Sequence, residues 1–363
     1  MSGPIDAHAA ANEFEFRDTV SGIAPHGNGH INDTFLVTCR AAGTAARYIL
    51  QNINRNVFRD PVAVMRNIER VTAHLAAQTE KEPDRERRAL RLIPARDGNN
   101  WHVDATGETW RAYLHIENAH SCDAASTAGE AFQAARAFGR FQQQLASLPP
   151  PRLTETIPDF HYTPKRFAAL EQAIAADVKN RAALAGPEIE FARSHKSIAG
   201  VLVSANLPER ITHNDTKINN VLLDDITGEA VCVIDLDTVM PGLALYDFGD
   251  MVRTTTSLSA EDEQDLNKVG LQFPLFEALV RGYLETAGAF LTPAEKQYLA
   301  FSGKLITFEI GIRFLADYLA GDTYFKVHRE GHNLDRCRTQ FKLVESIERQ
   351  EERMNRFVEA AAG

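Results

Sequence analysis

One continuous stretch decides the fold: residues 210–237, which read RITHNDTKINNVLLDDITGEAVCVIDLD. Two apolar runs, 221–223 and 230–234, flank a turn whose last residue is Gly228. This pattern predicts a β-hairpin. Because the strands of a hairpin run antiparallel, the residues just before the first strand and just after the second should lie close together.

The residues at that end of the predicted hairpin are acids, an amide, a histidine and a lysine. Those before the first strand are His213, Asp215, Lys217 and Asn220, and those after the second are Asp235 and Asp237. Carboxylates packed together repel one another unless a cation lies between them. A set of carboxylate and amide oxygens suits Mg²⁺, so the hairpin predicts a magnesium site.

The spacing His-x-Asp-x-Lys-x-x-Asn, followed by a hairpin and an aspartate, is typical of the catalytic loop of kinase-like phosphotransferases. In this interpretation Asp215 orients the substrate hydroxyl and accepts its proton, and Lys217 offsets charge on the transferred phosphoryl group. Asn220 and Asp235 hold magnesium, Asp237 holds or orders the metal, and His213 braces the loop. The alternative is a hairpin with a polar, solvated mouth, which the full spacing disfavours.

The sequence also contains a literal Asp-Phe-Gly tripeptide, at 247–249. It does not follow the hairpin strand, because a Met-Pro-Gly turn at 240–242 comes between. By position Asp235 is the metal aspartate. We expect Asp247 to accept backbone N–H bonds and to support the catalytic loop.

A second element precedes the first predicted strand and reads HGNGH at 26–30. Gly27 and Gly29 would let the backbone close over phosphates. Taken alone, such a pair indicates an ordinary turn. Its place at the start of a β-rich region, upstream of the catalytic loop, favours a nucleotide-binding loop.

The first third of the chain predicts a β-rich unit with one helix. The helix opens at Asp60-Pro61, an N-cap followed by a first-turn proline. The predicted strands are 35–39, 48–51, 92–94, 101–103 and 110–116.

After Asn118 the pattern becomes helical, apart from the hairpin. Capping-box-like starts stand at Ser259 and Thr292. The predicted helical stretches are 126–148, 164–184, 187–203 and the whole of the chain after 259. The sequence therefore predicts an α+β fold with a nucleotide-binding lobe at 1–118 and a larger, mainly helical lobe at 119–363, which holds the catalytic loop and the acceptor site.

Composition narrows the function classes. The chain has 363 residues, with 49 acidic and 39 basic side chains and a formal net charge of −10. This balance argues against non-specific nucleic-acid binding. No apolar run approaches the roughly 18 residues of a membrane span, and the N-terminus lacks a signal-peptide pattern. With four dispersed cysteines, these features predict a cytoplasmic protein with reduced thiols.

The chain resembles the aminoglycoside phosphotransferase and choline kinase superfamily, and within it the N-acetylhexosamine 1-kinases. The matching stretches lie in both predicted lobes, at 27–37, 48–54, 212–250, 313–325 and 332–340. The resemblance implies a protein-kinase-like, two-lobed fold. It also implies ATP- and Mg²⁺-dependent phosphorylation of the anomeric (C1) hydroxyl of N-acetylglucosamine or N-acetylgalactosamine.

The resemblance further implies which residues bind the substrates. Sugar contacts would come from His30, Arg313 and Tyr324, together with Asp215. Without the family, His30 is a turn residue, Tyr324 is a core or rim aromatic, and Arg313 pairs with helical acids four residues away. The partners would be a sugar and a nucleotide, with no nucleic acid and no membrane, in a monomer or weak homo-oligomer.

On the nucleotide side, Gly27, Gly29 and Gln51 would approach the phosphates, and the backbone of Leu114 and Ile116 would meet the base. One departure from the kinase pattern stands here: the strand expected to carry a phosphate-binding lysine reads Tyr-Ile-Leu-Gln at 48–51. Glu69, on the following helix, is in the region expected for the partner of that lysine.

Two alternatives remain open from the sequence. One is a kinase of the same superfamily acting on another sugar, an amino alcohol or an aminoglycoside. The other is a pseudokinase that serves as a binding module, which the missing lysine favours and the intact catalytic set disfavours.

Overall fold

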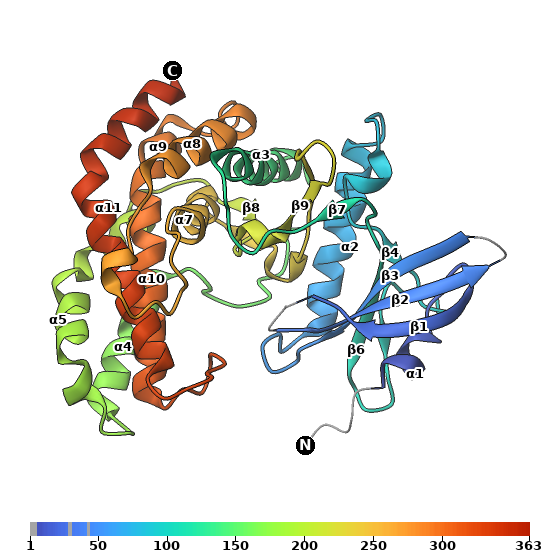
Figure 1. The fold of residues 1–363 in the computed structure, drawn as a ribbon, viewed down its shortest axis with the longest axis horizontal. Coiled ribbons are helices and arrows are strands. Elements are labelled where there is room, and N and C mark those ends of the chain that lie inside the picture. The colour runs from blue at the N-terminus through green and yellow to red at the C-terminus, as the bar shows by residue number, and fades with distance from the viewer. Residues whose placement is uncertain (1–5, 28–30, 42–43) are drawn as a thin grey trace.

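The computed structural model describes residues 6–27, 31–41 and 44–363. An antiparallel sheet lies on one side of the molecule and a group of helices on the other (Figure 1). The sheet has the order β1-β2-β3-β6-β4, and β5 also pairs with β6. Its strands are β1 (Thr19–Pro25), β2 (Asp33–Ala41), β3 (Thr44–Ile53), β4 (Leu92–Ile93), β5 (His102–Val103) and β6 (Thr109–Leu114).

The two faces of this sheet pack against different parts of the chain. Tyr48, Leu50 and Ala112 point to one face, where they form a core with α1 (Ala7–Ala11). Because side chains alternate along a strand, the residues between them, such as Ile49, point to the opposite face, against the main core.

Helix α2 (Pro61–Gln78) lies between the sheet and the helical part of the molecule (Figure 1). Its start follows the sequence pattern: the Asp60 side chain accepts the N–H of Ala63 at 3.0 Å, and Pro61 occupies the first turn. Ile68 and Val71 on its apolar face are fully buried, which joins the sheet to the main core.

The remaining helices form the larger part of the molecule. α3 packs along α8, and two glycines allow the close approach: a Cβ at Gly282 would lie 2.2 Å from the Phe132 carbonyl oxygen, and one at Gly139 would lie 2.5 Å from Thr286 Oγ1. The helices are α3 (Ala128–Leu145), α4 (Thr163–Ala176), α5 (Gly186–Ser194), α6 (Val201–Ser204), α7 (Ala244–Thr255), α8 (Phe273–Ala287), α9 (Pro293–Gln297), α10 (Leu299–Ala320) and α11 (His332–Ala362).

The predicted hairpin is present inside this helical part. β9 (Val221–Asp224) pairs antiparallel with β10 (Ala230–Val233), and β7 (Ala119–His120) adds a third strand beside β9. Beside them, β8 (Arg210–Thr212) pairs with β11 (Met240–Gly242). The α+β class predicted from the sequence is confirmed, with an antiparallel sheet in the N-terminal part and mainly helices in the C-terminal part.

Some predicted elements differ from the structure. The sequence reading omitted β1 and α1. It also expected a helix at Ser259, but the Ser259 hydroxyl donates to the Lys268 carbonyl oxygen and the next α-helix is α8. The long helix expected at 164–184 ends earlier, at Ala176, because Asp177 takes a left-handed conformation.

The capping box predicted at Thr292 is confirmed, and it opens α9. Within the described residues, no helix combines the length and the apolar character needed to span a bilayer.

Candidate active site

A buried carboxylate on α7 holds the backbone of the catalytic loop through hydrogen bonds. Asp247 is fully buried, and its two oxygens accept the backbone N–H groups of His213 (2.9 Å) and Asn214 (2.7 Å). Gln142 of α3 donates a third hydrogen bond at 2.6 Å. Burial raises the pKa of Asp247, while the N–H donors oppose that rise. The prediction that Asp247 supports the loop is confirmed.

His213 connects this loop to the end of the hairpin. Its ring stacks edge-on against Phe138 and Phe141 of α3, and its Nε2 lies 2.9 Å from the Ile234 carbonyl oxygen. Since that carbonyl can only accept, Nε2 carries a proton and donates it. His213 therefore braces the loop next to Asp235, as the sequence predicted.

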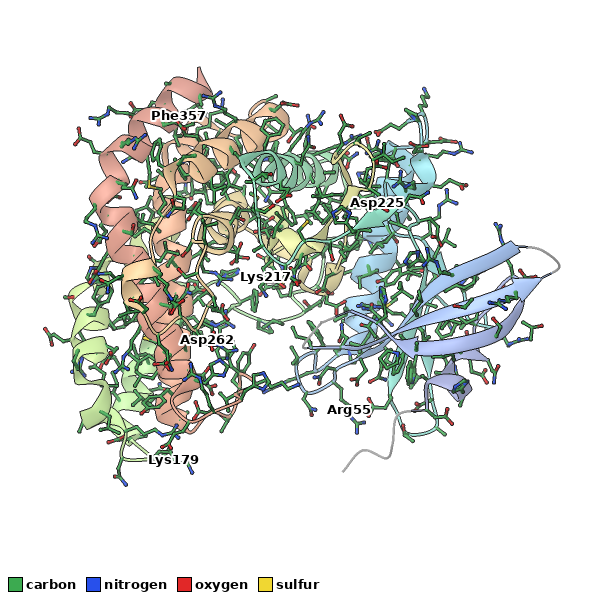
Figure 2. The ribbon with its side chains drawn as sticks, in the orientation of Figure 1. Arg55, Lys179, Lys217, Asp225, Asp262 and Phe357 are labelled. Atoms are coloured by element: carbon green, nitrogen blue, oxygen red, sulfur yellow. The ribbon has the colours of Figure 1, made fainter. Side chains whose placement is uncertain are left out.

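Asp215, Lys217 and Asn220 converge just after this brace. Lys217 Nζ lies 3.0 Å from Asp215 Oδ1, and Asn220 Nδ2 lies 3.3 Å from Oδ2 of the same carboxylate. Burial opposes ionisation of Asp215, but the Lys217 ammonium lowers the pKa of this carboxyl overall. Figure 2 labels Lys217 between the helices and the sheet. The arrangement gives an ionised carboxylate beside a partly exposed cation.

Asp235 lies on the other side of Asn220. The backbone N–H of Ile234 donates to the Asn220 carbonyl oxygen at 2.9 Å, which brings the two ends of the hairpin together. The pKa of Asp235 is raised to about 6. The main cause is partial desolvation by the surrounding protein, and the negative charges of Asp237 and Asp215 add to it. Such a crowd of carboxylates would ionise more readily around a cation.

The Asp237 carboxylate is bound by Arg111 of β6 and by Asn32, which directly precedes β2. Arg111 Nη1 of β6 donates to its Oδ1, and Asn32 Nδ2 donates to its Oδ2 at 2.5 Å. Its side chain is 3% exposed. Neither Arg111 nor Asn32 was predicted as a site residue; the available signal for Arg111 was one cation inside the apolar strand Trp-Arg-Ala-Tyr-Leu.

The predicted phosphate loop is only partly described. Gly27 has φ +74°, a conformation that disfavours residues with a side chain. Gly29 and His30 lie outside the described residues.

Gln51 of β3 is fixed by two neighbours. Its Nε2 donates to Thr34 Oγ1 at 3.0 Å, and its Oε1 accepts from Arg111 Nε at 2.9 Å. Glu69, the residue expected to pair with a lysine, accepts instead from Asn100 Nδ2 at 2.6 Å.

The predicted base-contact segment begins where β6 ends. The N–H of Leu114 donates to the Arg91 carbonyl oxygen. The strand ends at Leu114 rather than at Ile116 as predicted, and Ile116 packs in a small cluster with Val231 and Cys232 of β10. The segment thus runs directly over the hairpin.

Arg313 and Tyr324 lie close together in the helical part. The Arg313 guanidinium carbon lies 5.1 Å from the ring centre of Phe160, 5.9 Å from that of Tyr324 and 5.7 Å from that of Phe325. Among the residues described here, Arg313 makes no ion pair with a carboxylate. Arg313 therefore contacts aromatic rings rather than the helical acids four residues away. Tyr324 is 58% exposed.

A buried pair links that aromatic cluster to the catalytic loop. His161 Nδ1 lies 2.8 Å from Glu309 Oε1, and His161 Nε2 lies 3.1 Å from the Asn214 carbonyl oxygen. Glu309 stands one helical turn before Arg313 on α10. Sequence reasoning missed this link, because a single histidine and a glutamate far apart in sequence carry no spacing signal.

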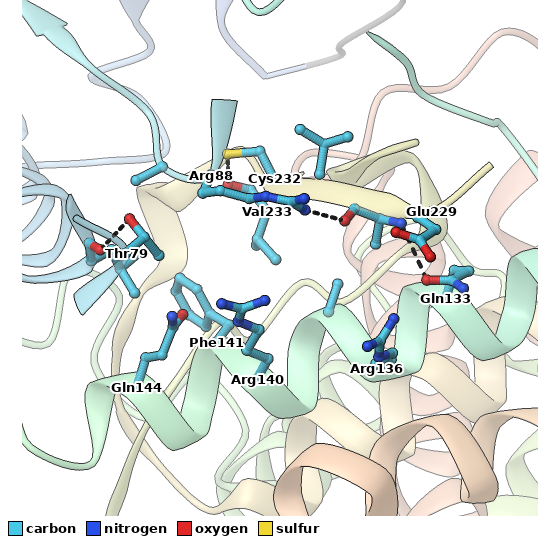
Figure 3. Close-up of a pocket in the computed structure, with 15 residues that line it drawn as sticks. Thr79, Arg88, Gln133, Arg136, Arg140, Phe141, Gln144, Glu229, Cys232 and Val233 are labelled. Atoms are coloured by element: carbon cyan, nitrogen blue, oxygen red, sulfur yellow. Dashed lines mark hydrogen bonds between the residues drawn. The ribbon is translucent and has the colours of Figure 1, made fainter. Parts of the chain in front are cut away.

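A separate cavity of about 150 Å³ lies between α3 and β10 (Figure 3). Arg136, Arg140 and Phe141 line it from α3, and Cys232 lines it from the strand. None of the predicted site residues lines this cavity, so it is distinct from the candidate active site. Its guanidinium groups already have partners; Arg140, for example, pairs with Glu82.

The residues present fit a magnesium ion shared with phosphate groups. Asn220 and Asp235 supply an amide and a carboxylate, and Mg²⁺ bound to a nucleotide usually takes one or two carboxylates plus phosphate oxygens. Within the described part of the chain, no cluster of three or more His, Cys, Asp or Glu side chains could hold a metal alone.

Residues 22–287 match the family model described as "Phosphotransferase enzyme family" (APH). The chain belongs to this phosphotransferase family. The match covers the sheet, the catalytic loop and the hairpin, and it ends with α8.

Solved structures of APH-type kinases share the fold. An aminoglycoside phosphotransferase from Alicyclobacillus acidocaldarius is 13% identical, with a TM-score of 0.65 over 99% of this chain and 98% of that chain. A spectinomycin phosphotransferase in complex with ADP and spectinomycin is 12% identical, with a TM-score of 0.60 over 96% and 99%. A microcompartment-associated aminopropanol kinase is 17% identical, with a TM-score of 0.58 over 96% and 98%. At these identities the likeness concerns the fold.

Proposed function

We propose that this phosphotransferase transfers the γ-phosphoryl group of ATP to the anomeric hydroxyl of an N-acetylhexosamine. The observation that carries the proposal is the convergence of Asp215, Lys217 and Asn220 beside Asp235. The sugar specificity rests on the resemblance of the sequence to N-acetylhexosamine 1-kinases and on the chemistry of the acceptor side.

In the reaction, the C1 oxygen attacks the γ-phosphorus and the bond to the β–γ bridging oxygen breaks. The hydroxyl proton passes to Asp215, and the products are the sugar 1-phosphate and ADP. Because phosphoryl transfer needs positioning more than proton abstraction, an ionised Asp215 with a lowered pKa suits a role in orienting the hydroxyl.

Lys217 and the metal-binding residues would offset the negative charge of the triphosphate and of the transferred phosphoryl group. The Lys217 ammonium, 3.0 Å from Asp215, can reach the oxygens of the transferred group and offset their charge. Asn220 and Asp235 would hold Mg²⁺, which neutralises triphosphate charge when bound. On the nucleotide side we assign Gly27, Gly29 and Gln51 to the phosphates, and the backbone of Leu114 and Ile116 to the base.

The charges around the predicted acceptor residues support a neutral acceptor. Arg313 and Arg166 lie close enough that the first lowers the pKa of the second, whose burial lowers it more. The nearby carboxylates already have partners: Glu309 is bound by His161 and by the Thr163 hydroxyl at 2.6 Å, Asp317 accepts from Asn333 and from the backbone N–H of Tyr324 at 2.8 Å, and Asp159 pairs with Lys165. A cationic amino alcohol would meet two guanidinium groups there, whereas a sugar can stack on Tyr324 and accept hydrogen bonds from Arg313.

A substrate panel tests the proposal. Purified protein with MgATP is offered N-acetylglucosamine, N-acetylgalactosamine, their 1-O-methyl glycosides, ethanolamine, choline and an aminoglycoside, and ADP formation is followed. We expect turnover with the free hexosamines and none with the methyl glycosides, because the methyl group blocks the reacting oxygen.

The other outcomes have clear meanings. Phosphorylation of the methyl glycosides would move the reaction to another hydroxyl. Preference for an amino alcohol or an aminoglycoside would show that the acceptor is a cationic compound and not an N-acetylhexosamine. Nucleotide binding without turnover on any acceptor would favour the pseudokinase alternative.

A further inference from the structure

The segment that follows α10 folds back against the last turn of that helix. Gly321, with φ +99°, caps the end of α10, and Asp322 continues in the left-handed conformation with φ +59°. The chain reverses there, and the Asp322 N–H donates to the Asp317 carbonyl oxygen at 2.8 Å. A left-handed residue with a side chain costs energy unless contacts hold it, so the turn needs support from its neighbours.

One buried carboxylate supplies that support to the three residues after the turn. Asp317 Oδ1 accepts the backbone N–H groups of Thr323 at 2.9 Å and of Tyr324 at 2.8 Å. Its Oδ2 accepts the N–H of Phe325 at 3.0 Å. An ionised carboxylate accepts on both oxygens, and hydrogen bonds to a charged acceptor are the stronger ones. Residues 323–325 are therefore fixed to a single side chain.

A second buried side chain orients this carboxylate. Asn333 lies in the first turn of α11, and its Nδ2 donates to Asp317 Oδ2 and to Asp322 Oδ1, each at 2.9 Å. The other oxygen of Asp322 accepts from Arg181 Nη1 at 2.6 Å. The segment is thus tied to both α10 and α11.

The segment held in this way presents an exposed aromatic ring. Tyr324 stays exposed, while the next residue, Phe325, packs on Phe314 of α10 at a centroid distance of 4.6 Å. The Tyr324 ring meets Phe325 edge-on at 4.8 Å. In Figure 1 the segment between α10 and α11 extends from the helices toward the sheet. An exposed ring adds little stability through burial, so its rigid support suits a binding contact.

We propose that Asp317 is a positioning residue of the acceptor site: it holds Tyr324 in place before the acceptor binds, and Asn333 orients it. This inference rests on the proposed function, because it takes Tyr324 as an acceptor contact. Arg313 stands one turn before Asp317 on α10, and its guanidinium carbon lies 5.9 Å from the Tyr324 ring centre. One helix therefore carries one acceptor contact and the support of another. A ring fixed in advance loses little freedom when the acceptor binds.

A double-mutant cycle tests whether Asp317 acts through Tyr324. Initial rates at saturating MgATP and varied N-acetylglucosamine or N-acetylgalactosamine are measured for the wild type, Asp317→Asn, Tyr324→Ala and the double variant. We expect Asp317→Asn to raise the KM for the sugar about 10- to 100-fold, the size expected for lost hydrogen bonds to a charged group. Its MgADP affinity should stay within about twofold. The double variant should match Tyr324→Ala, because residues that act through one contact are not additive.

Hydrogen exchange measures the hold on the segment without any substrate. The amides of residues 323–325 should exchange faster in Asp317→Asn than in the wild type, because their acceptor is weaker. Asn333→Ala removes the amide that orients the carboxylate but keeps the carboxylate itself. It should raise the exchange rates and the KM in the same direction, which keeps the test decisive if Asp317→Asn does not fold.

Asp104 provides the matched control, because its carboxylate holds a turn in the same way elsewhere. Between β5 and β6, its Oδ1 accepts the backbone N–H groups of Thr106 at 2.8 Å and of Glu108 at 3.1 Å. Its Oδ2 accepts from Trp110 Nε1 at 3.0 Å. Asp104→Asn should lower the melting temperature without changing the KM for the sugar or the exchange of residues 323–325.

Unchanged exchange of residues 323–325 in Asp317→Asn would overturn the inference, and so would a double variant whose KM rises by the product of the two single effects. An equal rise of KM in Asp104→Asn would show a general effect of stability instead. If the wild type phosphorylated another acceptor and neither N-acetylhexosamine, the proposed function would fail, and the same cycle with that acceptor would decide on Asp317. Turnover of no acceptor at all would overturn both.

Discussion

His161 Nδ1 lies 2.8 Å from Glu309 Oε1, although 148 positions separate the two residues in the sequence. The opposite ring nitrogen lies 3.1 Å from the carbonyl oxygen of Asn214, the residue before Asp215. Both partners are acceptors, so the two hydrogen bonds coexist only while the ring carries both protons. The ring thereby ties α10 to a loop residue with φ +65°, a conformation that costs energy for a residue other than glycine.

Replacement of this ring should misplace the catalytic loop. We expect His161→Phe to lower kcat about 10- to 100-fold, because a small displacement of the reacting groups has effects of that size. The affinity for MgADP should remain unchanged, and the KM for the sugar should rise. Steady-state kinetics and nucleotide titration measure the three quantities.

A second histidine serves as the control for that variant. His195 packs its ring against Phe191 at a centroid distance of 4.0 Å, and its ring nitrogens face the Phe191 carbonyl oxygen and Glu348. His195→Phe should leave kcat unchanged even if it lowers the melting temperature. An equal fall of kcat in both variants would contradict a specific role of His161.

The role of Asp215 is tested by Asp215→Asn. Loss of the proton acceptor should reduce kcat about 10²- to 10⁴-fold. The amide keeps the shape of the carboxylate, and Lys217, with 44% of its side chain exposed, can be solvated once its partner is neutral. Nucleotide affinity should therefore persist, and full activity would refute the assignment.

Arg313 should contribute to acceptor binding rather than to the fold. We expect Arg313→Leu to raise the KM for the sugar about tenfold or more, as for a lost hydrogen bond from a charged group, without a change in MgADP affinity. Arg356→Gln, at an exposed arginine of α11 paired with Glu352, provides the control. If the KM for the sugar were the same in Arg313→Leu and in the wild type, Arg313 would not contribute to acceptor binding.

Glu295 should make stability depend on pH. Burial raises the pKa of Glu295, but hydrogen bonds from Arg210 (3.0 and 2.9 Å) and from Thr292 lower it more, so the pKa lies below the usual range of a glutamate. A carboxyl whose pKa is lower in the folded state adds stability above its unfolded pKa and loses it as pH falls through the folded pKa.

Glu295→Gln should therefore lower the free energy of unfolding by about 1–3 kcal/mol at neutral pH. The difference from the wild type should shrink as the pH drops from about 5.5 toward 3.5. Chemical denaturation at several pH values measures it, with the exposed Glu352→Gln as the control. A difference that stays constant over this range would contradict the sign.

Features set by neighbouring residues could be predicted from the sequence. Asp60-Pro61, the Thr292 capping box and the β9–β10 hairpin each depend on a few adjacent side chains, and all three form as expected. β1 was missed because its pairing with β2 is broken by an irregularity between Val20 and Gly22, which hides the alternation of apolar residues.

The residues of the candidate site also fall into two groups, those whose proximity follows from the sequence spacing and those brought together by tertiary packing. The residues from Asp215 to Asp235 share one short stretch, so spacing alone places them together. Arg111, His161 and Glu309 reach the site from other elements, and only tertiary packing brings them there. The division of the chain at residue 118 and the roles of Gly29 and His30 stay predictions.

The tripeptide 247–249 lies inside α7, where the Asp247 carboxylate holds the catalytic loop. Gly249 allows α7 to touch α10, because a Cβ there would lie 2.4 Å from the Ser302 carbonyl oxygen. A compound that displaces the metal-holding aspartate would therefore have to act on residues 235–237, because the literal Asp-Phe-Gly tripeptide is fixed inside a helix and holds the catalytic loop instead.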